Sequence, residues 1–174
     1  MENTSFSYAG FWKRFVAYII DEIIIGIVNT ILFIPVFFFL IGAGILSLEE
    51  FGEYGDFTTA SFNMQQYHDE DIIAFISVFI IVIIFFSILA IIVQWLYFAL
   101  MESSSKQATL GKMALNIKVV DMSGNRISFG RATGRYFGKI ISGLILMIGY
   151  IMAGFTEKKQ ALHDIMANCL VINA

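Results

Sequence analysis

The first candidate for chemistry in this sequence is a carboxylate inside an apolar segment. Asp21 lies early in the apolar run Phe15–Leu46. A charged side chain costs about 2.5 to 3.5 kcal/mol at the centre of a membrane-spanning helix, so Asp21 needs a partner. Arg14 precedes it by seven residues, which places both on one helical face, about 10 Å apart along the axis, and predicts a third group between them. Such a carboxylate can bind a proton or a small cation in turn, and a nearby arginine lowers its affinity for both.

Further polar residues are secondary candidates. Gln94 lies near the end of the second apolar run, and we expect it to hydrogen-bond to a neighbouring helix rather than to a ligand. Thr109 begins a short turn, Thr109–Lys112. After a capping Ser128, basic residues recur every four positions, opposite Phe129, Ala132 and Tyr136: Arg131, Arg135 and Lys139. We expect these to form a cationic stripe on a helix that lies on the anionic inner leaflet of a membrane.

Two long apolar runs must position these side chains. Phe15–Leu46 and Ile72–Leu100 each exceed the roughly 20 apolar residues that a spanning helix needs. Hydrophobic residues make up 58% of the 174 positions, which is more than a soluble domain carries. The sequence predicts a mainly α-helical membrane protein of one domain, with transmembrane helices over about 12–46 and 72–100. No signal peptide is apparent, so we expect the first helix to stay as an anchor.

The distribution of charge predicts the orientation. The segment 47–71 carries seven Asp and Glu and no Lys or Arg, whereas 102–139 carries seven Lys and Arg. Because Lys and Arg near membrane ends are retained in the cytoplasm, we expect a multi-pass protein of the cell membrane with both termini cytoplasmic and the acidic loop outside. We interpret that loop as a solvated surface, with attraction of cations as the alternative.

Shorter segments complete the predicted fold. A single crossing by the third apolar run, 140–155, would carry Lys158 and Lys159 outside. We therefore expect a re-entrant or interfacial hairpin that turns near Gly149, with a third spanning helix as the alternative. In the cytoplasmic segment 108–139, the run Ile117–Val120 predicts a strand. The tail, 160–173, predicts a short helix and a strand that pairs with it, which would set His163 and Asp164 near the inner mouth of the helices.

Three motifs occur in order along the chain: Gly10-Phe11-Trp12-Lys13-Arg14 leading into Asp21, then Thr109-Leu110-Gly111-Lys112, then Gln160-Ala161-Leu162-His163-Asp164. Together they resemble the RDD family of small membrane proteins, which is named for one arginine and two aspartates. The resemblance covers nearly the whole chain and implies that these residues are Arg14, Asp21 and Asp164. This sequence departs from the family pattern at Ala161, where members often have threonine, and in its long acidic loop.

The gap between Arg14 and Asp21 suggests a role for the tail. We expect Asp164 to reach Arg14 at the inner membrane boundary, with His163 packed beside it. The three charged residues would then form a structural network, and removing one partner from it would be costly.

The resemblance also implies a function, because transport of unidentified ligands, including sodium–proton antiport, is attributed to this family. We therefore expect exchange of a small cation and a proton. Two spans make a thin wall for a pathway, so transport would require a homo-oligomer. The alternative is a regulatory or assembly subunit that docks on a partner membrane protein, through small residues at Gly26, Gly42 and Gly44.

Other classes of function are disfavoured. The chain has two histidines and one cysteine, and it lacks a zinc-binding motif, a nucleophile elbow and a phosphate-binding glycine loop. We expect no enzyme activity, no metal and no cofactor. Nucleic acid is not implied either, because the basic stripe is interleaved with apolar residues.

Overall fold

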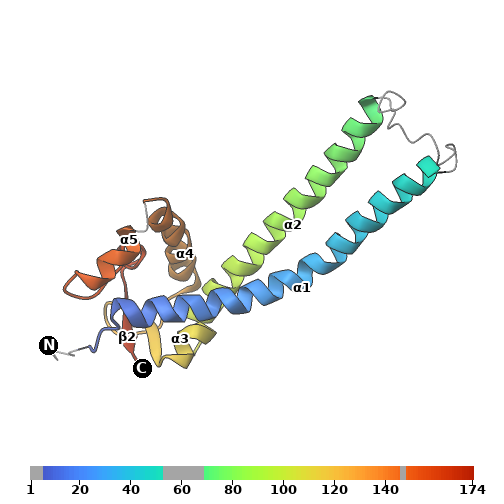
Figure 1. The fold of residues 1–174 in the computed structure, drawn as a ribbon. Helices are drawn as coiled ribbons and strands as arrows, with labels where there is room; N and C mark the ends of the chain where they lie inside the picture. The colour runs from blue at the N-terminus through green and yellow to red at the C-terminus, as the bar shows by residue number, and fades with distance from the viewer. Residues whose placement is uncertain (1–5, 53–68, 146–147) are drawn as a thin grey trace. The chain divides into compact units, whose positions relative to one another are not determined.

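The computed structural model describes residues 6–52, 69–145 and 148–174, and Figure 1 draws the helices and strands that they form. The elements in chain order are α1 (Phe11–Gly52), α2 (Asp69–Ser103), α3 (Leu110–Ala114), β1 (Ile117–Asp121), α4 (Phe129–Leu144), α5 (Ile148–Ile151), η2 (Met152–Gly154), α6 (Leu162–Met166) and β2 (Cys169–Asn173). Two helices are long and apolar enough to cross a membrane, over Phe11–Gly42 and Ile76–Ser103. The predicted class, a mainly helical membrane protein with a small sheet, is confirmed.

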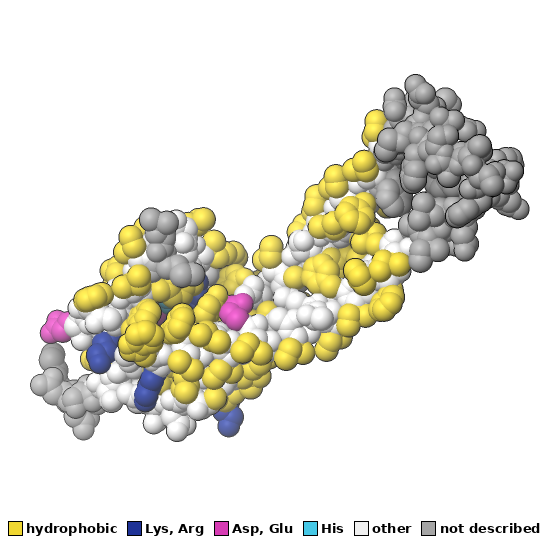
Figure 2. Space-filling model, viewed as in Figure 1, with side chains coloured by type: hydrophobic (Ala, Val, Ile, Leu, Met, Phe, Trp, Pro, Cys, Tyr) yellow, Lys and Arg dark blue, Asp and Glu magenta, His cyan; other side chains and the backbone are white. Residues whose placement is uncertain are grey.

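The chain divides into two compact units. The paired-helix unit is Gly26–Ile91, and the motif unit joins Met1–Ile25 to Ile92–Ala174. In the paired-helix unit the rings of Phe33 and Phe86 lie 5.9 Å apart. It contains no charged residue over 26–42 and 73–91, and its described acidic residues lie at the C-terminal end of α1 and the N-terminal end of α2: Glu49, Glu50, Asp69, Glu70 and Asp71. Figure 2 shows hydrophobic side chains over much of its visible surface.

The sheet of the motif unit pairs β1 with β2 in antiparallel register, with Val119 opposite Val171. This is the pairing that the two β-branched runs predict. The N-terminal segment lies along the other edge of β2, where Ala9 N donates to Val171 O at 2.9 Å. Fully buried side chains from both strands and from this segment form the core around the sheet: Ala9, Ile117, Val119, Cys169 and Val171.

The two long helices extend further than predicted. Residues 47–52 belong to α1 and 69–71 to α2, whereas the sequence placed both segments in the acidic loop. The prediction ended each helix at its last apolar residue, but Leu and Glu are good helix formers and hydrogen bonds continue past the apolar face. The rest of that loop, 53–68, lies outside the described residues.

The third apolar run is bent. The axes of α4 and of the α5–η2 segment differ by 116°, which fits either a re-entrant loop or a broken span. The break falls between Leu144 and Ile148, next to Gly149, so the chain bends near the predicted turn. Gly149 also permits close packing of α5 on α4, because an added Cβ would lie 2.7 Å from the Ser142 side chain.

Candidate functional site

Asp21 is held by three hydrogen bonds and is only 1% exposed. Its carboxylate accepts from the Tyr97 hydroxyl of α2 at 2.8 Å. It also accepts from the Thr109 hydroxyl at 2.5 Å and from Gly111 N at 2.8 Å, at the start of α3. Each oxygen therefore has at least one donor inside the protein, which offsets the cost of burying the charge.

The Thr109–Lys112 turn reaches Asp21 because residue 111 is glycine. A Cβ at Gly111 would lie 2.1 Å from the Ala17 carbonyl oxygen and 3.0 Å from the Asp21 carboxyl. No side chain fits such a gap, so α3 approaches α1 closely enough to bond Asp21 only with glycine there. The Thr109–Lys112 turn therefore binds Asp21, and the Thr109 hydroxyl supplies one of its hydrogen bonds.

Asp164 forms an ion pair with Arg14, the contact that the sequence predicts. It also accepts from Arg135 Nε at 2.8 Å and from Ala161 N at 3.0 Å. Arg14 in turn donates from Nε to Ala9 O at 2.9 Å. Burial alone would raise the pKa of Asp164, but the charges of Arg135 and Arg14 outweigh it and hold this pKa well below its usual range.

The predicted arrangement of Arg14 between two carboxylates is wrong. Among the described residues no ion pair or hydrogen bond joins Asp21 to Arg14 or to Asp164. Asp21 instead accepts a hydrogen bond from the backbone N–H of Gly111 in α3. Arg14 donates its remaining hydrogen bonds to the backbone carbonyls of Ala9 and Val171. The first and second aspartates therefore belong to two separate clusters.

Glu102 is a third buried carboxylate, which the sequence analysis did not single out. It is 1% exposed at the end of α2. It pairs with Lys112, with Arg135 at 2.8 Å and with Lys139 at 3.5 Å. Arg135 thus joins Glu102 to Asp164. An acidic residue directly after a long apolar run, followed by cations spaced for one helical face, is the signal that could have identified Glu102.

The predicted cationic stripe on the membrane surface is wrong for two of its three members. Arg135 is 2% exposed, and Lys139 is largely buried with Nζ 3.7 Å above the Phe98 ring. Only Arg131 has a half-exposed side chain. The four-residue spacing correctly placed Arg135 and Lys139 on one face of α4, but that face turns inward because Glu102 and Asp164 lie there.

His163 and Gln94 make local contacts. His163 Nε2 lies 3.6 Å from Asp164 and Nδ1 lies 3.4 Å from the Ser142 hydroxyl. Burial lowers the pKa of His163 to about 3, so its ring is neutral at physiological pH. Gln94 donates to Glu22 at 3.2 Å, which is the helix-to-helix contact expected for it.

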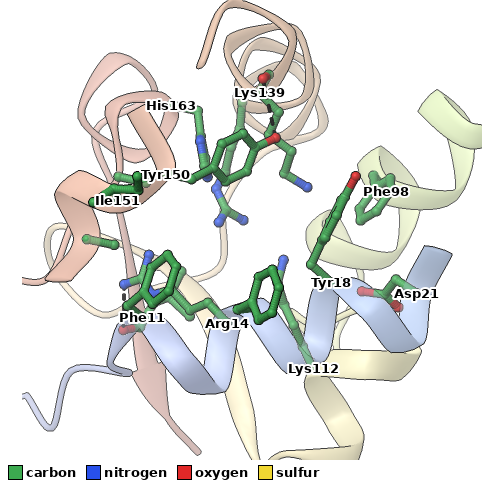
Figure 3. A pocket seen from close by; sticks show the side chains of 15 residues that line it. Phe11, Arg14, Tyr18, Asp21, Phe98, Lys112, Lys139, Tyr150, Ile151 and His163 are labelled. Atoms are coloured by element: carbon green, nitrogen blue, oxygen red, sulfur yellow. Dashed lines mark hydrogen bonds between the residues drawn. The ribbon is translucent and has the colours of Figure 1, made fainter. Parts of the chain in front are cut away.

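A cavity of about 250 Å³ adjoins these clusters. Figure 3 shows Phe11, Tyr18 and Tyr150 around it, with Lys112 and Lys139 approaching it from different elements. Burial lowers the pKa of Lys112 to about 7, although Glu102 opposes the shift. Among the described residues, no group of three His, Cys, Asp or Glu side chains is placed to hold a metal ion.

Comparison with known proteins places this arrangement in a family. The model of the RDD family matches residues 8–168. Two proteins of Bacillus subtilis strain 168 are similar along nearly their whole length. The uncharacterized protein YxaI is 36% identical over 94% of this chain and 96% of its own. The uncharacterized membrane protein YteJ is 30% identical over 99% of this chain and 85% of its own. No solved structure matches significantly. The chain therefore belongs to the RDD family of membrane proteins.

Proposed function

We propose that this protein is a non-catalytic regulatory or assembly subunit, which presents a rigid motif unit and an apolar helix pair to another membrane protein. One observation carries the proposal. The buried carboxylates Asp21, Glu102 and Asp164 each already have two or more donors or cations of the same chain. A carboxylate occupied in this way stabilises a fold and is poorly suited to exchanging ligands.

The paired-helix unit supports docking on a partner. In the apolar 18-residue stretch by which α1 could cross a membrane, only 11% of the residues are buried inside the protein. In the corresponding stretch of α2 none is buried. Gly26 and Gly42 both have open space where a Cβ would lie. Small residues on spanning helices allow another helix to approach closely. Gly44 lies outside the residues whose surroundings are described.

We further propose that the protein lies in the cell membrane with both termini in the cytoplasm and the motif unit at the cytoplasmic side of the membrane. The support is the segregation of Lys and Arg to 102–139 and their absence from 47–71. A motif unit on that side would meet the cytoplasmic parts of a partner.

Exchange of a cation and a proton by a homo-oligomer is the second candidate function. The feature that favours it is Lys112, which lines the cavity and whose pKa of about 7 suits uptake and release of a proton. Against it, the cavity is lined by four cationic side chains and by one carboxylate, Asp21, which is already bound. A small cation is repelled by such a lining.

The subunit function is tested by native electrophoresis of the tagged protein in mild detergent, from its own membranes and after purification. We expect a discrete complex larger than the purified protein. Gly26→Leu should dissociate this complex, because the larger side chain blocks close approach of a partner helix. Gly130→Leu is the matched control, because Gly130 also has open space around it and lies outside the two long helices. A protein that migrates identically from membranes and after purification would contradict the proposal.

A further inference from the structure

The cavity of the motif unit has two chemically different sides. Aromatic and aliphatic side chains from α1, α5 and η2 form one side: Phe11, Phe15, Tyr18, Ile151 and Ala153. The other side carries four basic residues, namely Arg14, Lys112, Arg135 and Lys139. A ligand that satisfies both sides must be partly apolar and must carry negative charge.

The basic side has more positive charge than the protein itself neutralises. Two carboxylates, Glu102 and Asp164, serve the ion pairs of all four cations. Asp21 is a third carboxylate beside the cavity, so the four cations exceed the three carboxylates by one positive charge. Buried charges without full compensation are costly, and an anion entering the cavity would relieve that cost.

Two of the cations also have donors without a hydrogen bond of good geometry. Arg135 is 2% exposed, yet its buried Nη1 makes no hydrogen bond of good geometry with any described residue, although Glu102 lies 2.8 Å away. Lys139 Nζ has no closer carboxylate than Glu102 at 3.5 Å and makes no hydrogen bond within the described part of the chain. Guanidinium and ammonium groups with free donors are the usual ligands of phosphate.

The surroundings of the cavity indicate where the ligand comes from. The elements that supply its apolar side also expose large hydrophobic side chains, including Trp12 at 74% and Ile151 at 46%. In a membrane protein such surface meets lipid. Basic pockets beside spanning helices on the cytoplasmic side are known to bind lipid headgroups.

We propose that this cavity binds the phosphate headgroup of one anionic membrane lipid, with Lys139 and Arg135 contacting the phosphate and with Phe15 and Ile151 contacting the start of the acyl chains. A volume of about 250 Å³ is small for a whole ligand. It holds the headgroup while the chains lie along the exposed hydrophobic surface.

The test is native mass spectrometry of the full chain in neutral detergent, with equal amounts of dioleoyl phosphatidylglycerol and dioleoyl phosphatidylcholine. We expect one phosphatidylglycerol to be retained preferentially. Lys139→Gln should reduce the preference about tenfold, the loss expected for one charge-assisted contact of about 1.4 kcal/mol. The control is Lys158→Gln, which removes an exposed lysine that does not line the cavity and should leave the preference unchanged.

A second variant separates lipid binding from damage to the ion pairs. Ala153→Leu fills the cavity from its apolar side and keeps every charge, so binding of phosphatidylglycerol should be lost while the melting temperature of the lipid-free protein is maintained. Inorganic phosphate distinguishes the source of the anion. If phosphate alone raised the melting temperature of the protein as much as phosphatidylglycerol does, the assignment to a lipid would be overturned. Equal retention of the two lipids, or an unchanged preference in both Lys139→Gln and Ala153→Leu, would overturn it as well.

Discussion

The motif unit and the paired-helix unit have similarly apolar sequences but differ in how their side chains are stabilised. The motif unit buries Asp21, Glu102, Arg135 and Asp164 and pairs them with one another or with backbone donors. The paired-helix unit has no charge over 26–42 and 73–91 and leaves most side chains there exposed. The first is therefore stabilised by its own polar contacts, whereas the second makes few such contacts and depends on its surroundings in the membrane.

Removing Arg135, the cation that pairs with both Glu102 and Asp164, should have the largest effect on the stability of the motif unit. Arg135→Leu leaves Glu102 and Asp164 buried without their shared partner, and breaking a buried pair costs about 3 to 5 kcal/mol. Thermal unfolding of the purified protein in detergent measures the loss. Arg131→Leu, on the same helix but half exposed, should change stability by less than about 0.5 kcal/mol. Similar melting temperatures for the two variants would show that Arg135 is not central.

A double-mutant cycle examines the contact between the two ends of the chain. Arg14→Ala and Asp164→Ala should each destabilise the protein, and the double variant should cost less than their sum by about 2 to 3 kcal/mol, because the two side chains form a buried ion pair. Denaturant unfolding monitored by tryptophan fluorescence supplies the free energies. Strict additivity would mean that the side chains do not touch.

The neutral His163 makes the stability of the motif unit depend on pH. Its pKa is about 3 in the folded protein and about 6.5 when unfolded. The unfolded chain therefore binds an extra proton between these values, so this contribution is complete above pH 6.5 and is lost as the pH falls toward 3. From pH 6.5 to pH 5 we expect a loss of about 2 kcal/mol.

The control for this pH dependence is His163→Gln, which cannot titrate. Its stability should vary less than that of the wild type between pH 6.5 and pH 5, when both are followed by thermal unfolding in the same detergent. Asp164 does not confuse the comparison, because its contribution is lost only below its unfolded pKa of about 3.8. Parallel pH profiles would assign the dependence to another group.

The smallest effect is expected in the paired-helix unit. Ile31 is 64% exposed, so Ile31→Ala removes few contacts within the protein and should lower stability in detergent by less than about 0.5 kcal/mol. The matched change in the motif unit, Ile117→Ala at a side chain 1% exposed, should cost about 2 to 5 kcal/mol. Unfolding by urea in detergent compares the two, and equal losses would remove the distinction between the units.

The sequence predicted those features that rest on periodicity and motif order. Apolar length identified the spanning helices, β-branched runs identified the strands, and the tail motif led to the contact of Asp164 with Arg14. It did not identify Glu102, and it placed Arg135 and Lys139 on a helix surface facing the inner leaflet of the membrane, although both are largely buried in the protein. The reason is physical: a cation spaced along a helix has the same pattern whether its face meets headgroups or a buried carboxylate, and only the fold brings Glu102 to that face.

The role of Gly111 also required the structure. Its φ is not in the left-handed region, so the motif gives no conformational reason for glycine. The reason is the Ala17 carbonyl, 2.1 Å from where a Cβ would be, which belongs to a helix some ninety residues earlier. Contacts of this kind depend on tertiary packing and cannot be derived from local pattern.

The central claim is that the buried carboxylates hold the motif unit together and do not carry a transported ion. Ion-dependent proton flux into liposomes that contain only this protein tests it most directly, with a pH-sensitive dye inside and Na⁺, K⁺ or Li⁺ gradients outside. We predict a flux equal to that of protein-free liposomes, with Asp21→Asn less stable than the wild type. An ion-dependent flux in the wild type that Asp21→Asn abolishes, and that Glu22→Gln retains, would contradict it.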